Sequence, residues 1–103
     1  MELTIHIPGN ILPVDRGKQF ADPLDAALRA ASLGELRDEG TQMGIEDGRY
    51  VVVGCDINVS VSDVTAALDI IRRVLRDARA PEATTILERG APPIVHPSHV
   101  GST

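Results

Sequence analysis

The stretch MGIEDGRYVVVGCDINV, residues 43–59, contains the clearest turn signal in the chain and a long run of apolar alternation. Asp47-Gly48 is typical of a two-residue hairpin turn, and apolar residues flank it on both sides. Successive residues of a strand point to opposite faces of the sheet, so the second arm of the hairpin has a core face and an outer face. We expect the core face to hold Val51, Val53, Cys55, Ile57 and Val59, and the outer face to hold Tyr50, Val52, Gly54, Asp56 and Asn58.

One strand and one helix are predicted before the hairpin. Residues 2–7 alternate polar and apolar side chains, which is typical of a strand that is buried on one face. A loop rich in proline and glycine follows and ends at Asp22-Pro23, where Asp can cap a helix and Pro can occupy its first position. We expect the helix to end at Gly34, which can adopt the left-handed conformation of a C-terminal cap. The glycines and charges of residues 35–44 give an ambiguous signal.

The second helix has the strongest helical pattern in the sequence. Ser60 or Ser62 is expected to cap its N-terminus, and Pro81 is expected to end it. The β-branched residues of segment 84–87 predict a short final strand. The apolar stripe of this helix comprises Val64, Ala67, Leu68, Ile71, Val74 or Leu75, and Ala78.

The resulting order is strand, helix, strand, strand, helix, strand. Two helices must bury their stripes against one face of the sheet, which predicts an α+β, two-layer ferredoxin-like sandwich (βαββαβ). Its four-stranded antiparallel sheet should have the first and third strands in the centre, with both helices on one face. We expect a single domain over residues 1–89, followed by a Pro/Gly-rich, uncharged C-terminal tail over residues 90–103.

Composition excludes several classes of function. The 103 residues include ten Lys plus Arg and fifteen Asp plus Glu, a formal net charge of -5, and the only aromatic residues are Phe20 and Tyr50. Nucleic-acid binding is therefore not expected, because it needs clustered cations or stacking rings. No apolar run is long enough to cross a membrane, and the chain has a single cysteine, so we expect a cytoplasmic protein. The preference for Arg over Lys suggests a bacterial source.

No catalytic or cofactor motif is present, so we expect no bound cofactor and favour a non-enzymatic protein. A small enzyme in a dimer-interface cleft around His6, Asp56 and Tyr50 is the less favoured alternative. Cys55 falls on the core face, where a thiol behaves as a small apolar residue. His96 and His99 in the tail, even with His6 and Cys55, do not make a convincing ligand set, and no metal site is predicted.

The predicted order of elements resembles that of several ferredoxin-like families. The motifs of those families are missing, however: Pro8-Gly9-Asn10-Ile11-Leu12 stands where acylphosphatases carry a phosphate-binding loop with an arginine. Only Tyr50 is available where RNA-recognition modules carry several aromatic residues, and the first loop lacks the Cys-x-x-Cys of metal chaperones. The resemblance therefore concerns the fold and transfers no functional residue.

Two surfaces remain as candidates for binding. Negative charge is concentrated along the hairpin, where it would either block unwanted sheet extension or attract a basic protein partner. The acidic residues are Glu35, Asp38, Glu39, Glu46 and Asp47.

The second candidate surface is the sheet face that no helix covers. It is expected to serve a homodimer or a ligand groove, and it includes His6, Tyr50, Val52, Gly54, Asp56 and Asn58. His6 and Asp56 become neighbours if the first and third strands pair, and a solvated polar pair is favoured over an acid–base dyad. The leading hypothesis is a non-enzymatic protein-interaction module, with immunity-type proteins as one version. The alternative is a small-molecule-binding regulatory domain with its ligand on the sheet face or at the dimer interface.

Overall fold

The structure is a computed structural model that describes residues 1–11 and 13–89. The predictions for the tail, with His96 and His99, lie outside these residues. The described elements are β1 (Glu2–Pro8), α1 (Pro13–Arg16), a π-helical segment η1 (Gly17–Ala21), α2 (Asp22–Ala30), β2 (Gly34–Glu46), β3 (Arg49–Val61), α3 (Val64–Asp77) and β4 (Thr85–Arg89).

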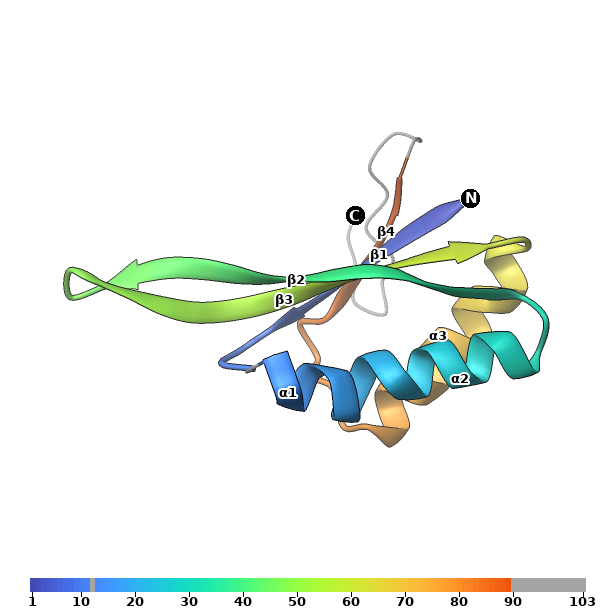
Figure 1. The fold of residues 1–103 in the computed structure, drawn as a ribbon, viewed down its shortest axis with the longest axis horizontal. Coiled ribbons are helices and arrows are strands. Elements are labelled where there is room, and N and C mark those ends of the chain that lie inside the picture. The colour runs from blue at the N-terminus through green and yellow to red at the C-terminus, as the bar shows by residue number, and fades with distance from the viewer. Residues whose placement is uncertain (12, 90–103) are drawn as a thin grey trace.

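The protein has an α+β fold in which one antiparallel sheet is covered by helices on one face (Figure 1). The strand order is β2-β3-β1-β4, so β1 and β3 occupy the centre, as the sequence predicted. The opposite face of the sheet carries no helix among the described elements (Figure 1). No helix in the described part of the chain is long and apolar enough to span a membrane.

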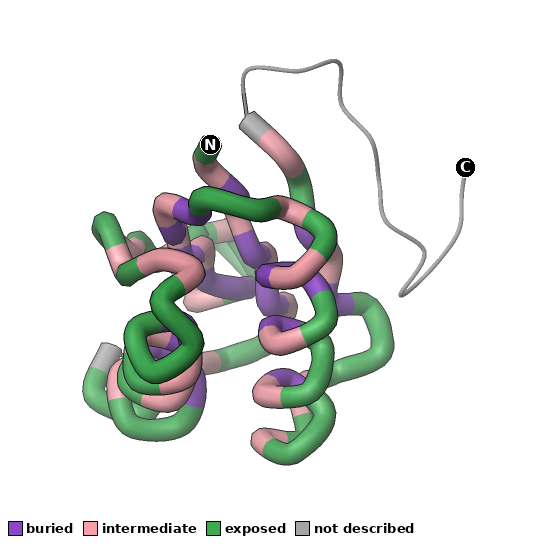
Figure 2. Tube along the Cα trace, turned by 90° about the vertical axis from the view of Figure 1, so that its right-hand side faces the viewer, coloured by how far each residue is buried: buried purple, intermediate pink, exposed green. Residues whose placement is uncertain are grey.

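The core lies between the sheet and the helices, where Figure 2 shows the buried positions gathered on the facing sides of both layers. Alternation in β1 buries Leu3, Ile5 and Ile7, and every second residue of β3 from Cys55 to Val61 is buried as well. The helices contribute Phe20, Ala21, Leu24, Leu28, Ala67, Leu68, Ile71 and Leu75. The apolar stripe predicted for α3 is thus confirmed at its buried positions, which are Ala67, Leu68, Ile71 and Leu75.

α2 begins at Asp22, as predicted, but it continues a helical region that starts at Pro13. The loop predicted over residues 13–21 is therefore wrong, and Asp22 does not cap a free helix end. Phe20 and Leu24 extend the apolar stripe one turn toward the N-terminus, and both are buried. Pro23 lacks an N–H to bond the carbonyl four residues earlier, and the wider π-helical turn falls directly before it. The prolines and glycines of this segment are therefore accommodated inside a helix instead of forming the predicted loop.

The left-handed residue that ends α2 is Ser32, with φ 56°, and the prediction of Gly34 for this role is wrong. Ser32 N–H donates to the Arg29 carbonyl and Leu33 N–H to the Leu28 carbonyl, which together close the helix end. Gly34 instead starts β2, where a Cβ would lie 2.1 Å from the Ser60 carbonyl oxygen. Position 34 therefore requires glycine, because β2 and β3 approach each other closely there.

The N-cap of α3 is Asp63, whose side chain accepts a hydrogen bond from Ala66 N–H at 3.1 Å. The predictions of Ser60 and Ser62 are wrong: Ser60 still belongs to β3, which continues to Val61, and Ser62 precedes the capping residue by one position. Ser62 binds elsewhere: its N–H donates to the Leu33 carbonyl at 2.9 Å. That bond ties the turn after β3 to the turn after α2.

The hairpin turn is confirmed, with positive φ at both Asp47 and Gly48. A β-bulge at Val53 shifts the register, so that Gln42 pairs with Gly54 and Met43 with Val52. Because successive residues of β2 point to opposite faces, Val52 and Gly54 lie on opposite faces as well. The predicted single outer face therefore changes sides at the bulge, and Val53, predicted in the core, is 43% exposed.

Candidate functional site

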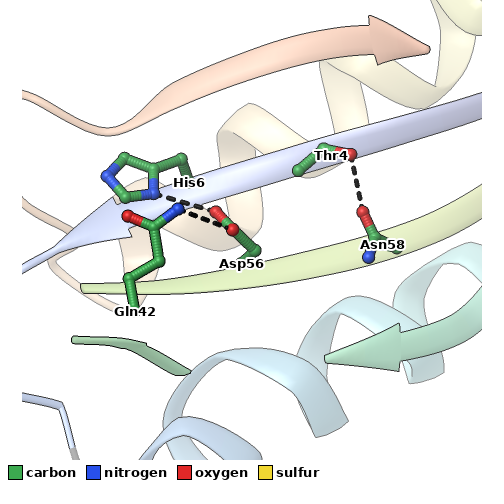
Figure 3. A network of polar contacts seen from close by, with 5 residues as sticks. All are labelled: Thr4, His6, Gln42, Asp56 and Asn58. Carbon is green, nitrogen blue, oxygen red and sulfur yellow. Dashed lines mark hydrogen bonds and ion pairs between the residues drawn. The ribbon is translucent and has the colours of Figure 1, made fainter. Parts of the chain in front are cut away.

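A row of three polar side chains crosses the open face of the sheet (Figure 3). Asp56 is central: its Oδ1 lies 2.8 Å from His6 Nδ1, and its Oδ2 accepts a hydrogen bond of 2.8 Å from Gln42 Nε2. A carboxylate only accepts hydrogen bonds, so this arrangement assigns the donated proton to Nδ1 and leaves His6 Nε2 as the second ring nitrogen. The expected proximity of His6 and Asp56 is found, since the two residues pair directly across β1 and β3.

Gly54 makes room for this arrangement. A Cβ at position 54 would lie 3.0 Å from His6 Cε1 and 2.9 Å from the Ile7 carbonyl oxygen. The imidazole therefore lies against the bare backbone of β3. The backbone that approaches Gly54 closely is that of β1 in the same sheet.

A second polar row runs parallel to the first, two residue pairs further along β1 and β3 (Figure 3). Thr4 Oγ1 donates to Asn58 Oδ1 at 2.6 Å, and Asn58 Nδ2 donates to Asp38 Oδ1. Both rows link all three of the strands β1, β3 and β2. The open face is consequently a fixed polar surface whose side chains hydrogen-bond to one another.

A hollow of about 370 Å³ adjoins the His6 row on the side of β4. Its polar lining consists of Thr4, His6, Gln42, Asp56 and Thr85, and Leu87 contributes an apolar wall. The side chains of His6 and Asp56 are 33% and 30% exposed, so solvent and small solutes can reach the pair. Chemically, the imidazole can exchange a proton or a hydrogen bond with a molecule in this hollow.

The acidic residues of the hairpin do not form one patch. Glu35 and Glu46 lie near opposite ends of β2, separated by roughly 35 Å at the usual rise per residue of a strand. Glu39 is on the helix side of the sheet and is paired with Arg16, which is only 9% exposed. Asp38 belongs to the open face, and Glu46 and Asp47 lie at the tip of the hairpin.

The distal part of the β2–β3 hairpin, residues 43–53, extends beyond the helices that cover the sheet (Figure 1); we call it the hairpin arm. Met43 pairs with Val52 and Ile45 with Tyr50, which places four apolar or aromatic side chains on one face. Met43, Ile45 and Tyr50 are 53%, 71% and 78% exposed. The tip beside them is acidic, with Glu46 and Asp47.

Three of these features were missed from the sequence. Met43 and Ile45 appeared there only as strand residues, and Tyr50 and Val52 were assigned to the open face, because no sequence pattern indicated that the hairpin extends beyond the helices. Gln42 was overlooked because its partner Asp56 lies on the other arm of the hairpin. Arg16 fell within the segment predicted as a loop, whereas it pairs with Glu39, donates from Nη1 to Thr41 Oγ1 at 2.6 Å and fixes α1 to β2.

Cys55 is fully buried, as expected, and burial raises the pKa of its thiol. Among the described residues no cluster of three or more His, Cys, Asp or Glu side chains could hold a metal ion. The predicted homodimer through the open face stays a prediction.

Comparisons with known protein families, with curated proteins and with solved structures find no match for this chain.

Proposed function

We propose that the protein is a non-enzymatic interaction module that binds a basic partner protein through the hairpin arm. The observation that carries this proposal is the exposure of Met43, Ile45 and Tyr50 on an element that projects past its own core. Side chains of this kind are normally buried or used in interfaces, and aromatic residues and methionine are enriched in interface cores.

Charge favours a basic partner over a second copy of the chain. The formal net charge is -5, and the arm ends in Glu46 and Asp47, with Arg49 as the nearby cation. Two copies joined through this arm would bring like charges together, whereas a basic surface would be attracted to the tip. β2 is also an edge strand, so its outer backbone edge is open to an added segment of a partner.

The fold is compatible with an interaction module that presents the hairpin arm to a partner. The strand order β2-β3-β1-β4 fits a ferredoxin-like arrangement, in which we propose that the sheet and helices act as a rigid base for the arm. The bacterial source and cytoplasmic location expected from the sequence are part of the same proposal.

Affinity capture with matched variants tests the proposed function. The arm variant Ile45→Asp/Tyr50→Asp and the control Val14→Asp both place charge at exposed apolar positions, since Val14 is 62% exposed on α1. Burial of one such side chain contributes roughly 1.5–3 kcal/mol, so the arm variant should weaken binding by about a hundredfold or more.

The expected result is a basic protein retained by the wild type and by Val14→Asp but lost from the arm variant. Glu46→Lys/Asp47→Lys should weaken the same capture, and added salt should weaken it in the wild type. Capture that is equal for all variants would contradict the proposal. Light scattering that shows a wild-type dimer and a monomeric arm variant would assign the arm to self-association instead.

A second candidate function rests on the hollow beside His6. We propose as the alternative a regulatory domain that binds a small polar ligand there, with His6 and Asp56 as its hydrogen-bonding groups. A thermal-shift screen with free amino acids and common mononucleotides, run on the wild type and on His6→Gln, tests it. A shift seen only in the wild type supports the alternative, and equal shifts or none reject it.

A further inference from the structure

A second hollow, distinct from the open face and the hairpin arm, lies between α3 and the start of β4. Its volume is about 350 Å³, within the range of small-ligand sites. Leu75 and Ile86 belong to the core and form its apolar part, while Arg72, Arg76 and Glu82 supply the charged groups.

Within the described part of the chain, the two arginines have no carboxylate partner. Arg72 and Arg76 are four residues apart on α3 and therefore lie on the same side of the helix, where like charges repel each other. Within residues 1–11 and 13–89 neither guanidinium forms an ion pair, whereas Arg73 between them is paired with Asp69 at 3.2 Å. An anion placed between Arg72 and Arg76 would relieve this repulsion.

A separate observation points to a ligand at the same place. Thr84 lines the hollow and is 6% exposed, and its Oγ1 is a buried polar atom without a hydrogen-bond partner in the described structure. A buried hydroxyl left unpaired costs free energy, and such groups call for an explanation. This oxygen has almost no accessible surface, so a ligand oxygen would supply the missing partner by displacing the atoms that cover it.

We propose that this hollow binds a small organic anion with an apolar body, of the monocarboxylate class. Arg72 and Arg76 bind the carboxylate, Leu75 and Ile86 contact the apolar body, and Thr84 hydrogen-bonds a ligand oxygen. Glu82 at the rim limits the local positive charge and favours a monoanion over a multiply charged ligand. This site is independent of partner binding by the hairpin arm.

Octanoate is a suitable probe, and 1-octanol is its uncharged control. In a ¹⁵N NMR titration of the full chain, octanoate should saturate and shift the amide signals of Ala80, Thr84 and Ile86, and octanol should bind at least tenfold more weakly. Arg72→Gln/Arg76→Gln should weaken octanoate binding at least tenfold, while Arg73→Gln should change it less than twofold. Binding that does not saturate at millimolar octanoate, or that is equal for octanol or for the double variant, would overturn the proposal.

Thr84→Val provides a second test, because it keeps the shape of the side chain and removes the hydroxyl. The variant should have a higher thermal midpoint than the wild type without ligand, and its octanoate affinity should fall severalfold. An unchanged octanoate affinity would remove Thr84 from the site. Ile45→Asp/Tyr50→Asp should bind octanoate as the wild type does, so failure of either proposal leaves the other intact.

Discussion

The imidazole of His6 lies against Gly54, where a Cβ would come within 3.0 Å of its Cε1 atom. The same Cβ would lie 2.9 Å from the carbonyl oxygen of Ile7, so backbone as well as side chain would have to move. Glycine at position 54 therefore couples the pairing of β1 and β3 to the position of the histidine on the open face.

Gly54→Ala should destabilise the protein by about 1–3 kcal/mol, because the added methyl group overpacks a strand-to-strand contact. It should also displace the His6 ring and lengthen its hydrogen bond to Asp56. Urea denaturation measures the first effect, and the ring proton shifts of His6 report the second. Gly40→Ala is the matched control, since a Cβ at position 40 has no atom within 4 Å. Equal stability of the two variants would show that the contact at Gly54 carries no strain.

The open face could be predicted in part from its residues. Strict alternation in β1 placed Thr4 and His6 on one side, and direct pairing with β3 brought them to Asn58 and Asp56. The positions of Tyr50 and Val52 could not be predicted in this way. A bulge at Val53 reverses the face of every residue beyond it, and a bulge is decided by the pairing of two strands rather than by a local pattern.

The first helix shows a different limit of sequence reasoning. Pro13 and Gly17 favour a loop when each is considered alone, and Asp22-Pro23 favours the start of a new helix after it. Burial of Phe20 and Leu24 against the sheet outweighs those local preferences, and the π-helical turn accommodates Pro23. That burial is a tertiary effect, which is why the continuous helical region and the role of Arg16 were not evident from the sequence.

Asp25 links α2 to β2 and should stabilise the protein at neutral pH. Its Oδ1 accepts hydrogen bonds from Leu36 N–H at 2.8 Å and from Arg29 Nε at 2.9 Å. The backbone hydrogen bond from Leu36, followed by that from Arg29, lowers the pKa of this carboxyl below its usual value. A lowered folded-state pKa means that the stabilisation is present above the unfolded pKa of about 4 and is lost as pH falls through the folded value.

Asp25→Asn should therefore lower the free energy of unfolding by about 1 kcal/mol at pH 7, and this deficit should shrink as the pH is lowered below about 4. Denaturant unfolding at pH 7, 4 and 2.5 measures the deficit. Asp69→Asn is the control, because the interaction of Asp69 within residues 1–11 and 13–89 is an exposed ion pair with Arg73, and its effect should stay below about 0.5 kcal/mol. A deficit at Asp25→Asn that is the same at every pH would contradict the assignment of charge to this interaction.

Ser32→Gly should stabilise the protein by about 0.5–1 kcal/mol, because Ser32 adopts a left-handed conformation that costs a residue with a Cβ. Ala30→Gly, two residues earlier and inside the last helical turn, is the opposite control and should cost about 1 kcal/mol. Thermal unfolding of the two variants distinguishes them. A loss of stability in Ser32→Gly would contradict this prediction and would mean that contacts of the serine side chain outweigh the strain of its left-handed backbone.

Cys55 should make stability fall at high pH. Burial raises the pKa of its thiol in the folded protein, so the folded state favours the neutral form. The stabilisation is fully present below the unfolded pKa of about 8.5 and is lost as pH rises through the folded value.

Cys55→Ala leaves a small cavity and should be less stable at pH 7, but its deficit relative to the wild type should narrow between pH 8 and pH 10. Unfolding curves at these pH values provide the measurement, and a thiol reagent should modify native Cys55 only as fast as the protein opens. Rapid modification at pH 8 without unfolding would show that the thiol is accessible and would remove the basis for this pH dependence.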